Sequence, residues 1–162
     1  MLRLTKKADY SLMALRHLAA QPRGNSVSAK EVADSYGIPL PLLSKILQKL
    51  GKAGLVSSEQ GTNGGYRLAR EANLISALEV IRTIDGPIIL ASCFTEHVHC
   101  DHAARCSVKR PLHRLHEAIL RLLDSVTIED MLRDTDDIGS SSPLVALQAI
   151  SSPAQLFGSL RK

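Results

Sequence analysis

All three cysteines of the chain lie in one short polar segment, CFTEHVHCDHAARC, which runs from residue 93 to residue 106. The same segment holds three of the six histidines. Thiolates and imidazoles are the side chains that bind soft and borderline metal ions. Buried free cysteines usually lie in apolar surroundings, whereas these lie among polar residues. The segment is therefore predicted to be an exposed loop that binds a metal ion or cluster, rather than to contain three incidental small hydrophobic residues.

The spacing of the thiols limits the type of metal site. Cys93, Cys100 and Cys106 are separated by six and five residues, so no pair has the Cys-x-x-Cys spacing that is commonest in structural zinc sites. Three converging thiolates suit zinc, copper(I) or an iron–sulfur cluster, and spacing alone leaves these alternatives open. A cluster normally needs four protein ligands. Here the fourth would be a histidine, a carboxylate or an exchangeable group, and such a labile cluster suits a sensor.

Composition predicts one domain, with or without an appendage, around an aliphatic core. Of 162 residues, 44% are hydrophobic and only 3% are aromatic. No apolar run approaches the roughly 20 residues that span a bilayer, and the opening MLRLTKKADY lacks the apolar segment of a signal peptide. We therefore expect a cytoplasmic protein, in which thiols stay reduced. Three cysteines also cannot pair completely in a disulfide framework.

Charge is distributed unevenly along the chain. Residues 1–70 carry 11 Lys and Arg against 4 Asp and Glu, a net charge of +7, whereas residues 71–162 carry 9 against 12, a net charge of −3. A basic first half is typical of a nucleic-acid-binding protein, although an ordinary solvated surface would have the same charge.

The first half also predicts three helices followed by a hairpin. Apolar residues at helical spacing follow Thr5, a capping box at Ser28 begins a short helix, and a third helix follows Pro41. Residues 55–68, LVSSEQGTNGGYRL, then predict two strands joined by a tight turn. This order is typical of a winged helix-turn-helix domain. We predict a mainly α fold with a small β-hairpin wing, and the charge favours DNA binding over a generic α+β domain.

The predicted DNA-binding residues lie on the third helix, which would be the recognition helix, on the wing and at the start of the short second helix. Lys45 and Lys49, with Ser44 and Gln48, are expected to face the major groove, and the wing glycines allow close approach to phosphate. The full set is Ser28, Pro41, Ser44, Lys45, Gln48, Lys49, Gln60, Gly61, Gly64, Gly65 and Arg67.

The second half predicts three further helices around the cysteine segment. A capping box begins at Ser76, with Ile75 and Val80 as a hydrophobic staple, and its helix ends before Gly86-Pro87. After the cysteines, a heptad-like spacing of 3-4-3-4 predicts a helix that pairs with a second subunit or packs on its own domain. A homodimer would suit a palindromic operator. The heptad residues are Leu112, Leu115, Ile119, Leu122 and Val126.

A last short helix is expected at Thr127, with two carboxylates at its positive end. Beyond Asp134 the sequence becomes acidic and then Gly/Ser-rich, which is typical of a flexible tail. The predicted organisation is a DNA-binding domain (1–86), a cysteine loop (87–110), a dimerisation helix with a short helix (111–134) and a tail (135–162).

Residues 1 to about 133 resemble the IscR/NsrR-type family of winged-helix regulators that carry iron–sulfur clusters. The resemblance rests on LRLTKKADY, on GLVSSEQGTNGGYRLAR across the wing, on TIDGP, on the three cysteines and on VTIEDM. It implies a cytoplasmic homodimer, a role as repressor or activator of transcription, and a [4Fe–4S] or [2Fe–2S] cluster held by Cys93, Cys100 and Cys106. The spacing between the first two cysteines and the sequence after GP are also similar to those of the branch that regulates the SUF cluster-assembly operon.

The resemblance leaves the fourth ligand open. Some members place a histidine three residues after the last cysteine, where this chain has Lys109. The nitric-oxide-sensing branch uses an acid from the first helix of the partner subunit, and Asp9 stands at that position. The three loop histidines, His97, His99 and His102, are the alternatives.

The recognition helix departs from the best-known members at three positions, Pro41, Leu42 and Ser44, so their operator sequence does not transfer. The sequence thus predicts a dimeric regulator that senses cluster supply, nitric oxide or redox state. A DNA-binding protein stapled by zinc, without sensing, is the alternative. An enzyme with a cysteine nucleophile has no support, because no base or cofactor-binding motif accompanies the thiols.

Overall fold

The computed structural model describes residues 4–22, 24–61, 64–91, 94 and 105–133. The chain divides into two units, residues 1–132 and 133–162, and of the second only Arg133 is described. The predicted tail, 135–162, therefore lies outside the described residues.

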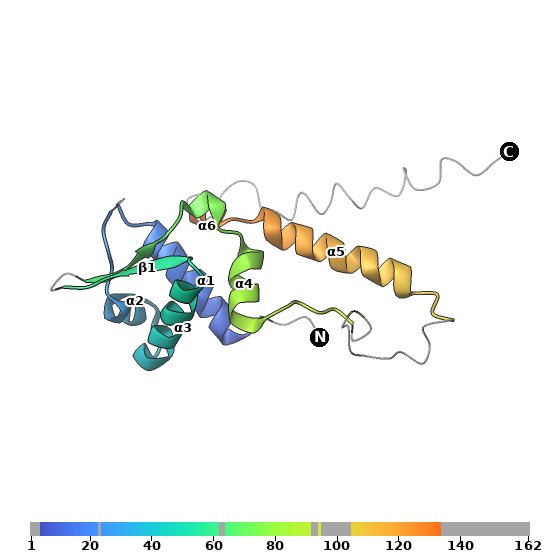
Figure 1. Ribbon diagram of the computed structural model, residues 1–162, viewed down its shortest axis with the longest axis horizontal. Helices are drawn as coiled ribbons and strands as arrows, with labels where there is room; N and C mark the ends of the chain where they lie inside the picture. Colours follow the sequence, from blue (N-terminus) through green and yellow to red (C-terminus); the bar gives the residue numbers. More distant parts are fainter. Residues whose placement is uncertain (1–3, 23, 62–63, 92–93, 95–104, 134–162) are drawn as a thin grey trace. The chain divides into compact units, whose positions relative to one another are not determined.

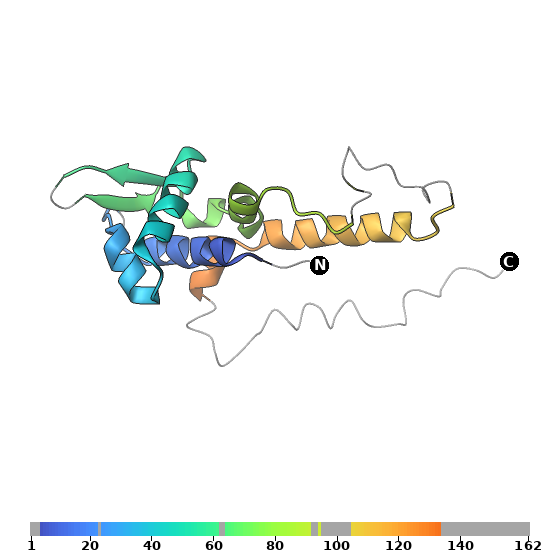
Figure 2. The same ribbon diagram turned by 90° about the horizontal axis from the view of Figure 1, so that it is seen from below.

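Helices dominate the first unit, and the two strands form one antiparallel hairpin (Figures 1 and 2). Val56 pairs with Leu68 at the base of the hairpin, and Glu59 pairs with Gly65 near its turn. The predicted fold class, mainly α with a small wing, is confirmed. In chain order the elements are α1 (Lys6–Ala19), α2 (Ala29–Tyr36), α3 (Leu40–Lys52), β1 (Val56–Glu59), β2 (Gly65–Leu68), the 3₁₀ turn η1 (Ala72–Leu74), α4 (Ala77–Asp85), α5 (Lys109–Ser125) and α6 (Ile128–Arg133).

Side-chain caps fix where most of these helices begin. Thr5, Ser28 and Ser76 each accept a hydrogen bond from the backbone amide three residues later, as N-cap residues do. Before α6, Thr127 and Asp130 bond reciprocally: the Thr127 amide donates to the Asp130 carboxylate at 2.9 Å, and the Asp130 amide donates to the Thr127 hydroxyl at 3.1 Å. The predicted helix starts are thus set by local polar contacts.

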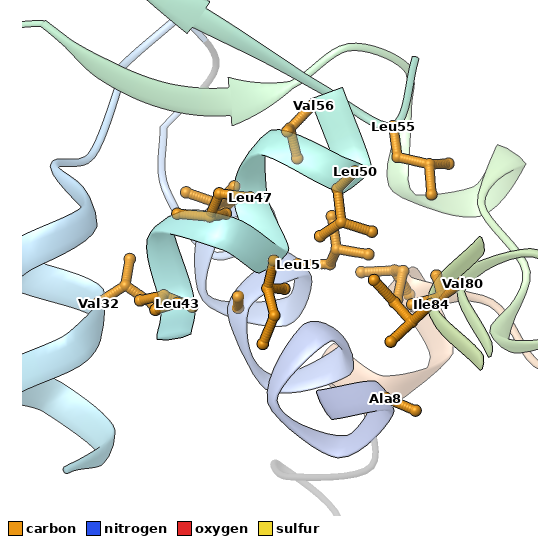
Figure 3. Close-up of a cluster of buried hydrophobic side chains, with 14 of the residues drawn as sticks. Ala8, Leu15, Val32, Leu43, Leu47, Leu50, Leu55, Val56, Val80 and Ile84 are labelled. Carbon is orange, nitrogen blue, oxygen red and sulfur yellow. The ribbon is translucent and has the colours of Figure 1, made fainter. Parts of the chain in front are cut away.

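The core of the unit is aliphatic, as the composition predicts (Figure 3). It is built mainly from the inward faces of α1, α3 and α4, together with residues of the hairpin base. Ile75 and Val80, the predicted staple pair, are both fully buried in this cluster. α3 contributes one entire face, which consists of Leu43, Ile46, Leu47 and Leu50.

The segment after α5 returns to this core. Ile128 of α6 is fully buried there. Its amide donates to the Ile75 carbonyl at 3.0 Å, and the Ala77 amide donates to the Val126 carbonyl at 2.8 Å. From α1, the Arg16 guanidinium donates to the Met131 carbonyl at 3.0 Å. The winged domain therefore includes residues that follow the long helix in sequence.

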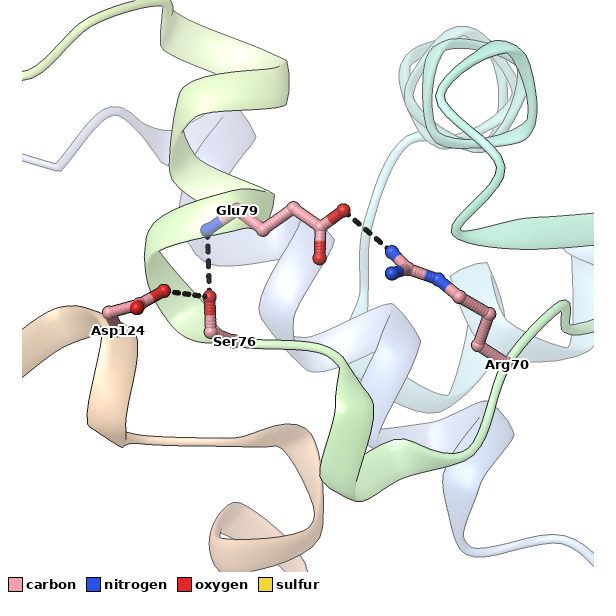
Figure 4. A network of polar contacts seen from close by, with 4 residues as sticks. All are labelled: Arg70, Ser76, Glu79 and Asp124. Atoms are coloured by element: carbon pink, nitrogen blue, oxygen red, sulfur yellow. Dashed lines mark hydrogen bonds and ion pairs between the residues drawn. The ribbon is translucent and has the colours of Figure 1, made fainter.

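A polar network connects the start of α4 to the end of α5 (Figure 4). The Ser76 hydroxyl accepts from the Glu79 amide at 3.2 Å and donates to the Asp124 carboxylate at 2.9 Å. The Glu79 carboxylate forms an ion pair with Arg70 at 2.6 Å. Glu79 thus links α4 to the segment after the wing, while Ser76 holds the C-terminal end of α5.

Replacing Ile128 by alanine should destabilise the winged domain, because it leaves a cavity in the core at a fully buried position. We expect the free energy of unfolding to fall by about 2–5 kcal/mol in urea titrations at fixed protein concentration. Leu74→Ala is the matched control, because Leu74 is 62% exposed, and it should change stability by less than about 0.5 kcal/mol. Equal losses in the two variants would contradict the placement of α6 in the core.

Candidate nucleic-acid interface and cysteine segment

α3 presents an exposed row, polar except for Pro41, opposite its buried face. Pro41, Lys45, Gln48 and Lys52 are all exposed, and their spacing of four, three and four residues places them on one side of the helix. Three of the four belong to the predicted DNA-binding set. Lys52 is not in the predicted set, although its position one helical turn after Gln48 indicates that it lies on the same side of the helix. Ser44 lies at the border of the row and is half-buried.

A groove of about 460 Å³ lies between this row and the hairpin. Gln48 and Lys52 line it from α3, and Ser57, Ser58 and Tyr66 line it from the strands. These side chains offer amide, ammonium and hydroxyl groups, which are donors suited to phosphate oxygens and base edges. The three strand residues were not in the predicted set, because their facing depends on the packing of the wing against α3.

Lys49 is also exposed, but it lies beside this row, toward the buried face of α3. Its ammonium donates to the Ile84 carbonyl at the C-terminal end of α4, at a distance of 2.8 Å. In this structure Lys49 thus joins two helices of the domain, and its DNA contact stays a prediction.

The wing glycines have a structural reason of their own. A Cβ atom on Gly65 would lie 2.5 Å from the Val27 carbonyl oxygen, and one on Gly64 would lie 2.5 Å from the Glu59 carbonyl oxygen. Val27 and Tyr66 exchange backbone hydrogen bonds of 2.9 and 2.8 Å, so β2 lies directly against the residue before Ser28. Close approach to the chain's own backbone thus accounts for both glycines.

The other predicted DNA-binding residues lie around the same face. Gln60 and Gly61 are exposed next to the hairpin turn, and Gly61 has a positive φ of 130°. Arg67 pairs across the hairpin with Glu59 at 2.9 Å. Both side chains are largely exposed, so this ion pair contributes little stability and can exchange for a phosphate. Ser28 caps α2 and is half-buried.

Part of the cysteine segment is described. Cys106 is a free, half-buried thiol that lies three residues before α5. Cys93, Cys100 and the histidines at positions 97, 99 and 102 lie outside the described residues, as does any contact between them. Within the described part of the chain, no three His, Cys, Asp or Glu side chains are close enough to hold a metal ion.

Phe94, which directly follows Cys93, packs on α5. Its ring centroid lies 5.7 Å from that of His113 and 5.3 Å from that of His116. This contact places Phe94 against the first half of α5. Asp9, the candidate ligand from α1, is exposed in the first turn of its helix, and Lys109 is exposed at the start of α5.

The predicted heptad seam of α5 divides into two stripes. Leu112 and Ile119 are half-buried, as expected for the side of α5 that faces its own chain. Leu115 and Leu122 are 50% and 55% exposed, and Val108, seven residues before Leu115, is 54% exposed. α5 thus carries an exposed apolar stripe with heptad spacing. None of the helices in the described ranges has the length and hydropathy that a bilayer span requires.

Comparison with known proteins shows to which family this architecture belongs. Residues 4–134 match the Rrf2 family model, which is described as an iron-dependent transcriptional regulator. The chain belongs to the Rrf2 family.

Individual Rrf2 relatives agree with this assignment. The chain is 37% identical to the HTH-type transcriptional regulator NsrR of Shouchella clausii over 138 residues, which cover 85% of this chain and 93% of the relative. It is 38% identical to NsrR of Bacillus licheniformis, with 85% and 96% covered.

Two solved structures are also similar. CymR, the global cysteine regulator of B. subtilis, superposes with a TM-score of 0.69 and 31% identity, covering 82% of this chain and 98% of that chain. IscR of T. potens superposes with a TM-score of 0.66 and 29% identity, covering 90% and 96%. The chain is thus a DNA-binding transcription regulator and not an enzyme, and the family resemblance seen in the sequence is confirmed.

Gly65→Ala should disrupt the base of the wing, because the new methyl group would collide with the Val27 backbone. We expect a loss of about 1–3 kcal/mol in unfolding free energy, measured by urea denaturation. Gly51→Ala is the control: Gly51 lies in α3, and a Cβ there meets Val56 at an ordinary 3.8 Å. It should be neutral or stabilising by up to about 1 kcal/mol. Unchanged stability of Gly65→Ala would show that the wing shifts freely away from Val27.

Proposed function

We propose that this Rrf2 regulator acts in the cytoplasm as a homodimer whose affinity for operator DNA is set by an iron–sulfur cluster in the cysteine segment. One observation carries the proposal. The segment joins α4, which packs on the recognition helix α3, to α5, whose outer stripe is apolar and exposed. A change in the segment therefore acts on two helices at once: one positions the DNA-reading helix, and the other is suited to hold a second subunit.

The exposed stripe of α5 is the proposed dimer contact. Val108, Leu115 and Leu122 recur every seven residues, which is the spacing of a helix that packs lengthwise on another helix. The helix is amphipathic, and about half of the surface of each of these three side chains is exposed. A second copy of the chain supplies a matching stripe by symmetry, since a two-fold contact uses the same surface twice. The dimer would then present two α3 rows to a palindromic operator.

The proposed cluster ligands are Cys93, Cys100 and Cys106. The donor set fits the group, because thiolates are the usual ligands of iron–sulfur clusters, and Cys106 is a free thiol with partial exposure. When bound, such a cluster, [4Fe–4S] or [2Fe–2S], supplies a centre that reacts with nitric oxide, oxygen or changes of redox state. The chain's own contribution would be to anchor the segment at Phe94, whose ring packs on His113 and His116.

Asp9 of the partner subunit is the proposed fourth ligand. It is exposed and lies in the first turn of α1. A ligand from the partner would make cluster binding and dimer geometry interdependent. His97, His99 and His102 are the competing ligands from within the segment itself.

DNA reading is assigned to the exposed row of α3 and to the groove beside it. Lys45, Gln48 and Lys52 would face the major groove, where their donors can reach base edges and phosphates. The wing, from Gln60 to Gly65 with Arg67, would reach the flanking backbone. Two such surfaces must lie about 34–36 Å apart to read consecutive half-sites, so a small change in the dimer suffices to alter affinity.

Removal of the cluster should change operator affinity by about 5–150-fold, the usual range of coupling between two sites on one protein. Protein purified without oxygen should be coloured, and the cluster-bound form should bind its promoter fragment more tightly at fixed salt. Cys93→Ala, Cys100→Ala and Cys106→Ala should each lose the visible absorbance while retaining the fold. Asp9→Ala should release the cluster faster, and an unchanged decay rate would eliminate Asp9.

Two outcomes would contradict this proposal. Colourless protein that contains zinc would favour the stapled DNA-binding alternative. Equal operator affinities of the cluster-bound and cluster-free forms would make the cluster structural and remove its sensing role.

Leu115→Glu should dissociate the proposed dimer, because it places a charge in the middle of the apolar stripe. We expect the mass measured by sedimentation to fall from that of two chains to that of one. Glu117→Gln is the control, because Glu117 is exposed on the same helix outside the stripe. A Leu115→Glu protein that still sediments as two chains would place the dimer contact elsewhere.

A further inference from the structure

The C-terminal end of α4 is held by the recognition helix through a single charged side chain. The last four carbonyls of a helix have no partner within it, and the Ile84 carbonyl belongs to this group in α4. The Lys49 ammonium donates to it at 2.8 Å. A cation at this position also interacts favourably with the negative end of the helix dipole. The contact is a charge-assisted hydrogen bond, which is stronger than one between neutral groups.

A second contact holds the same end of α4 from the other side. The Thr5 hydroxyl donates to the Asp85 carboxylate at 2.6 Å, while also accepting from the Ala8 amide as the N-cap of α1. The chain then turns away at Gly86, whose φ of 85° and ψ of −163° favour glycine. The end of α4 is therefore fixed to both α1 and α3 immediately before the chain leaves toward the cysteine segment.

The position of Lys49 on α3 explains why it contacts α4. Its neighbours on the helix surface include Ile46, three residues before it, and it directly precedes Leu50; both are buried in the core. Both lysines are exposed, but Lys45 belongs to the row opposite the buried face, whereas Lys49 lies at the border between that row and the core. The aliphatic stem of Lys49 can thus follow the edge of the core while its ammonium reaches the end of α4.

We propose that Lys49 is a positioning residue, which fixes the orientation of the recognition helix on α4 and makes no phosphate contact of its own. This proposal rests on the assignment of DNA reading to α3. The proposal gives different roles to two lysines that are one helical turn apart. Lys45 binds DNA directly, whereas Lys49 affects DNA affinity through the packing of α3. The two roles differ in their dependence on salt, because only a lysine that contacts phosphate releases counterions from DNA.

The experiment compares full-length Lys49→Met, Lys49→Arg and Lys45→Met with the unsubstituted chain. Methionine keeps an aliphatic stem of similar length and removes the charge and the donor. The probe is a duplex selected by the unsubstituted chain from a random pool, together with a scrambled duplex of the same length. Binding is measured by fluorescence anisotropy at several salt concentrations, and amide hydrogen exchange is measured over residues 82–91 without DNA.

For Lys49→Met we expect specific binding to weaken about tenfold, a change that corresponds to about 1.4 kcal/mol. The slope of the logarithm of the binding constant against the logarithm of salt concentration (the salt slope) should stay unchanged. Binding to the scrambled duplex should stay unchanged as well. Exchange at the end of α4 should become faster. Lys49→Arg keeps a charged donor, so its specific binding should lie within about twofold of that of the unsubstituted chain. Lys45→Met should weaken both duplexes, lower the salt slope by about one and leave exchange at α4 unchanged.

A salt slope that falls by about one in Lys49→Met would identify a phosphate contact and overturn the proposal. Unchanged exchange at the end of α4 would overturn it as well, because the contact with Ile84 would then not hold that end. If no duplex were selected, the assignment of DNA reading to α3 would fail, while hydrogen exchange would still test the Lys49 contact by itself. Should Lys49→Met fail to fold, Lys49→Gln, which keeps a shorter donor, would take its place, with a smaller expected loss in specific binding and again an unchanged slope.

Discussion

Burial of one face of α3 is the constraint on which the rest of the domain depends. Leu43, Leu47 and Leu50 are fully buried, and Ile46 is 3% exposed. Because these four side chains fix the rotation of the helix, its opposite side must present Lys45, Gln48 and Lys52 to solvent. The neighbouring helices α1 and α4 and the hairpin base complete the aliphatic cluster around this face. The surface that we propose to read DNA is therefore determined by core packing, and disturbance of that core changes what α3 presents.

The core connects α3 to α4 through apolar packing, in which Val80, Ile81 and Ile84 take part. Polar contacts at the two ends of α4 add to this connection. At the N-terminal end, Ser76 bonds to Asp124 of α5, and at the C-terminal end, Ile84 and Asp85 accept hydrogen bonds from Lys49 and Thr5. Hydrogen bonds depend on direction, so these contacts restrict the orientation of α4 in addition to the packing of its buried side chains.

The sequence was sufficient for features that depend on near neighbours in the chain. Ser28 and Ser76 were predicted as caps because the amide that each satisfies lies three residues away, and the buried face of α3 followed from helical spacing. Contacts between distant segments could not be predicted in this way. Nothing in the sequence near Lys49 indicates that it donates a hydrogen bond to the Ile84 carbonyl. Nothing near Glu79 indicates that it forms an ion pair with Arg70. The heptad pattern of α5 likewise predicted one apolar seam, whereas the structure has a half-buried and an exposed stripe. Spacing alone does not reveal that other parts of the chain, including α4, cover one side of the helix. The roles of the three cysteines rest on chemistry and family resemblance.

The attachment of α5 has a mechanical consequence. Its C-terminal end is fastened to α4 through Asp124 and Val126, and the chain beyond it is anchored by Ile128. Its 17 residues span about 25 Å at 1.5 Å per residue, and Phe94 contacts the half that is farther from the anchor. α5 is in effect a lever with its fulcrum at the core. A displacement of about 2 Å at the Lys109 end corresponds to a rotation of about 5° at the fulcrum, so a modest force applied there exerts a large torque on the packing of α4.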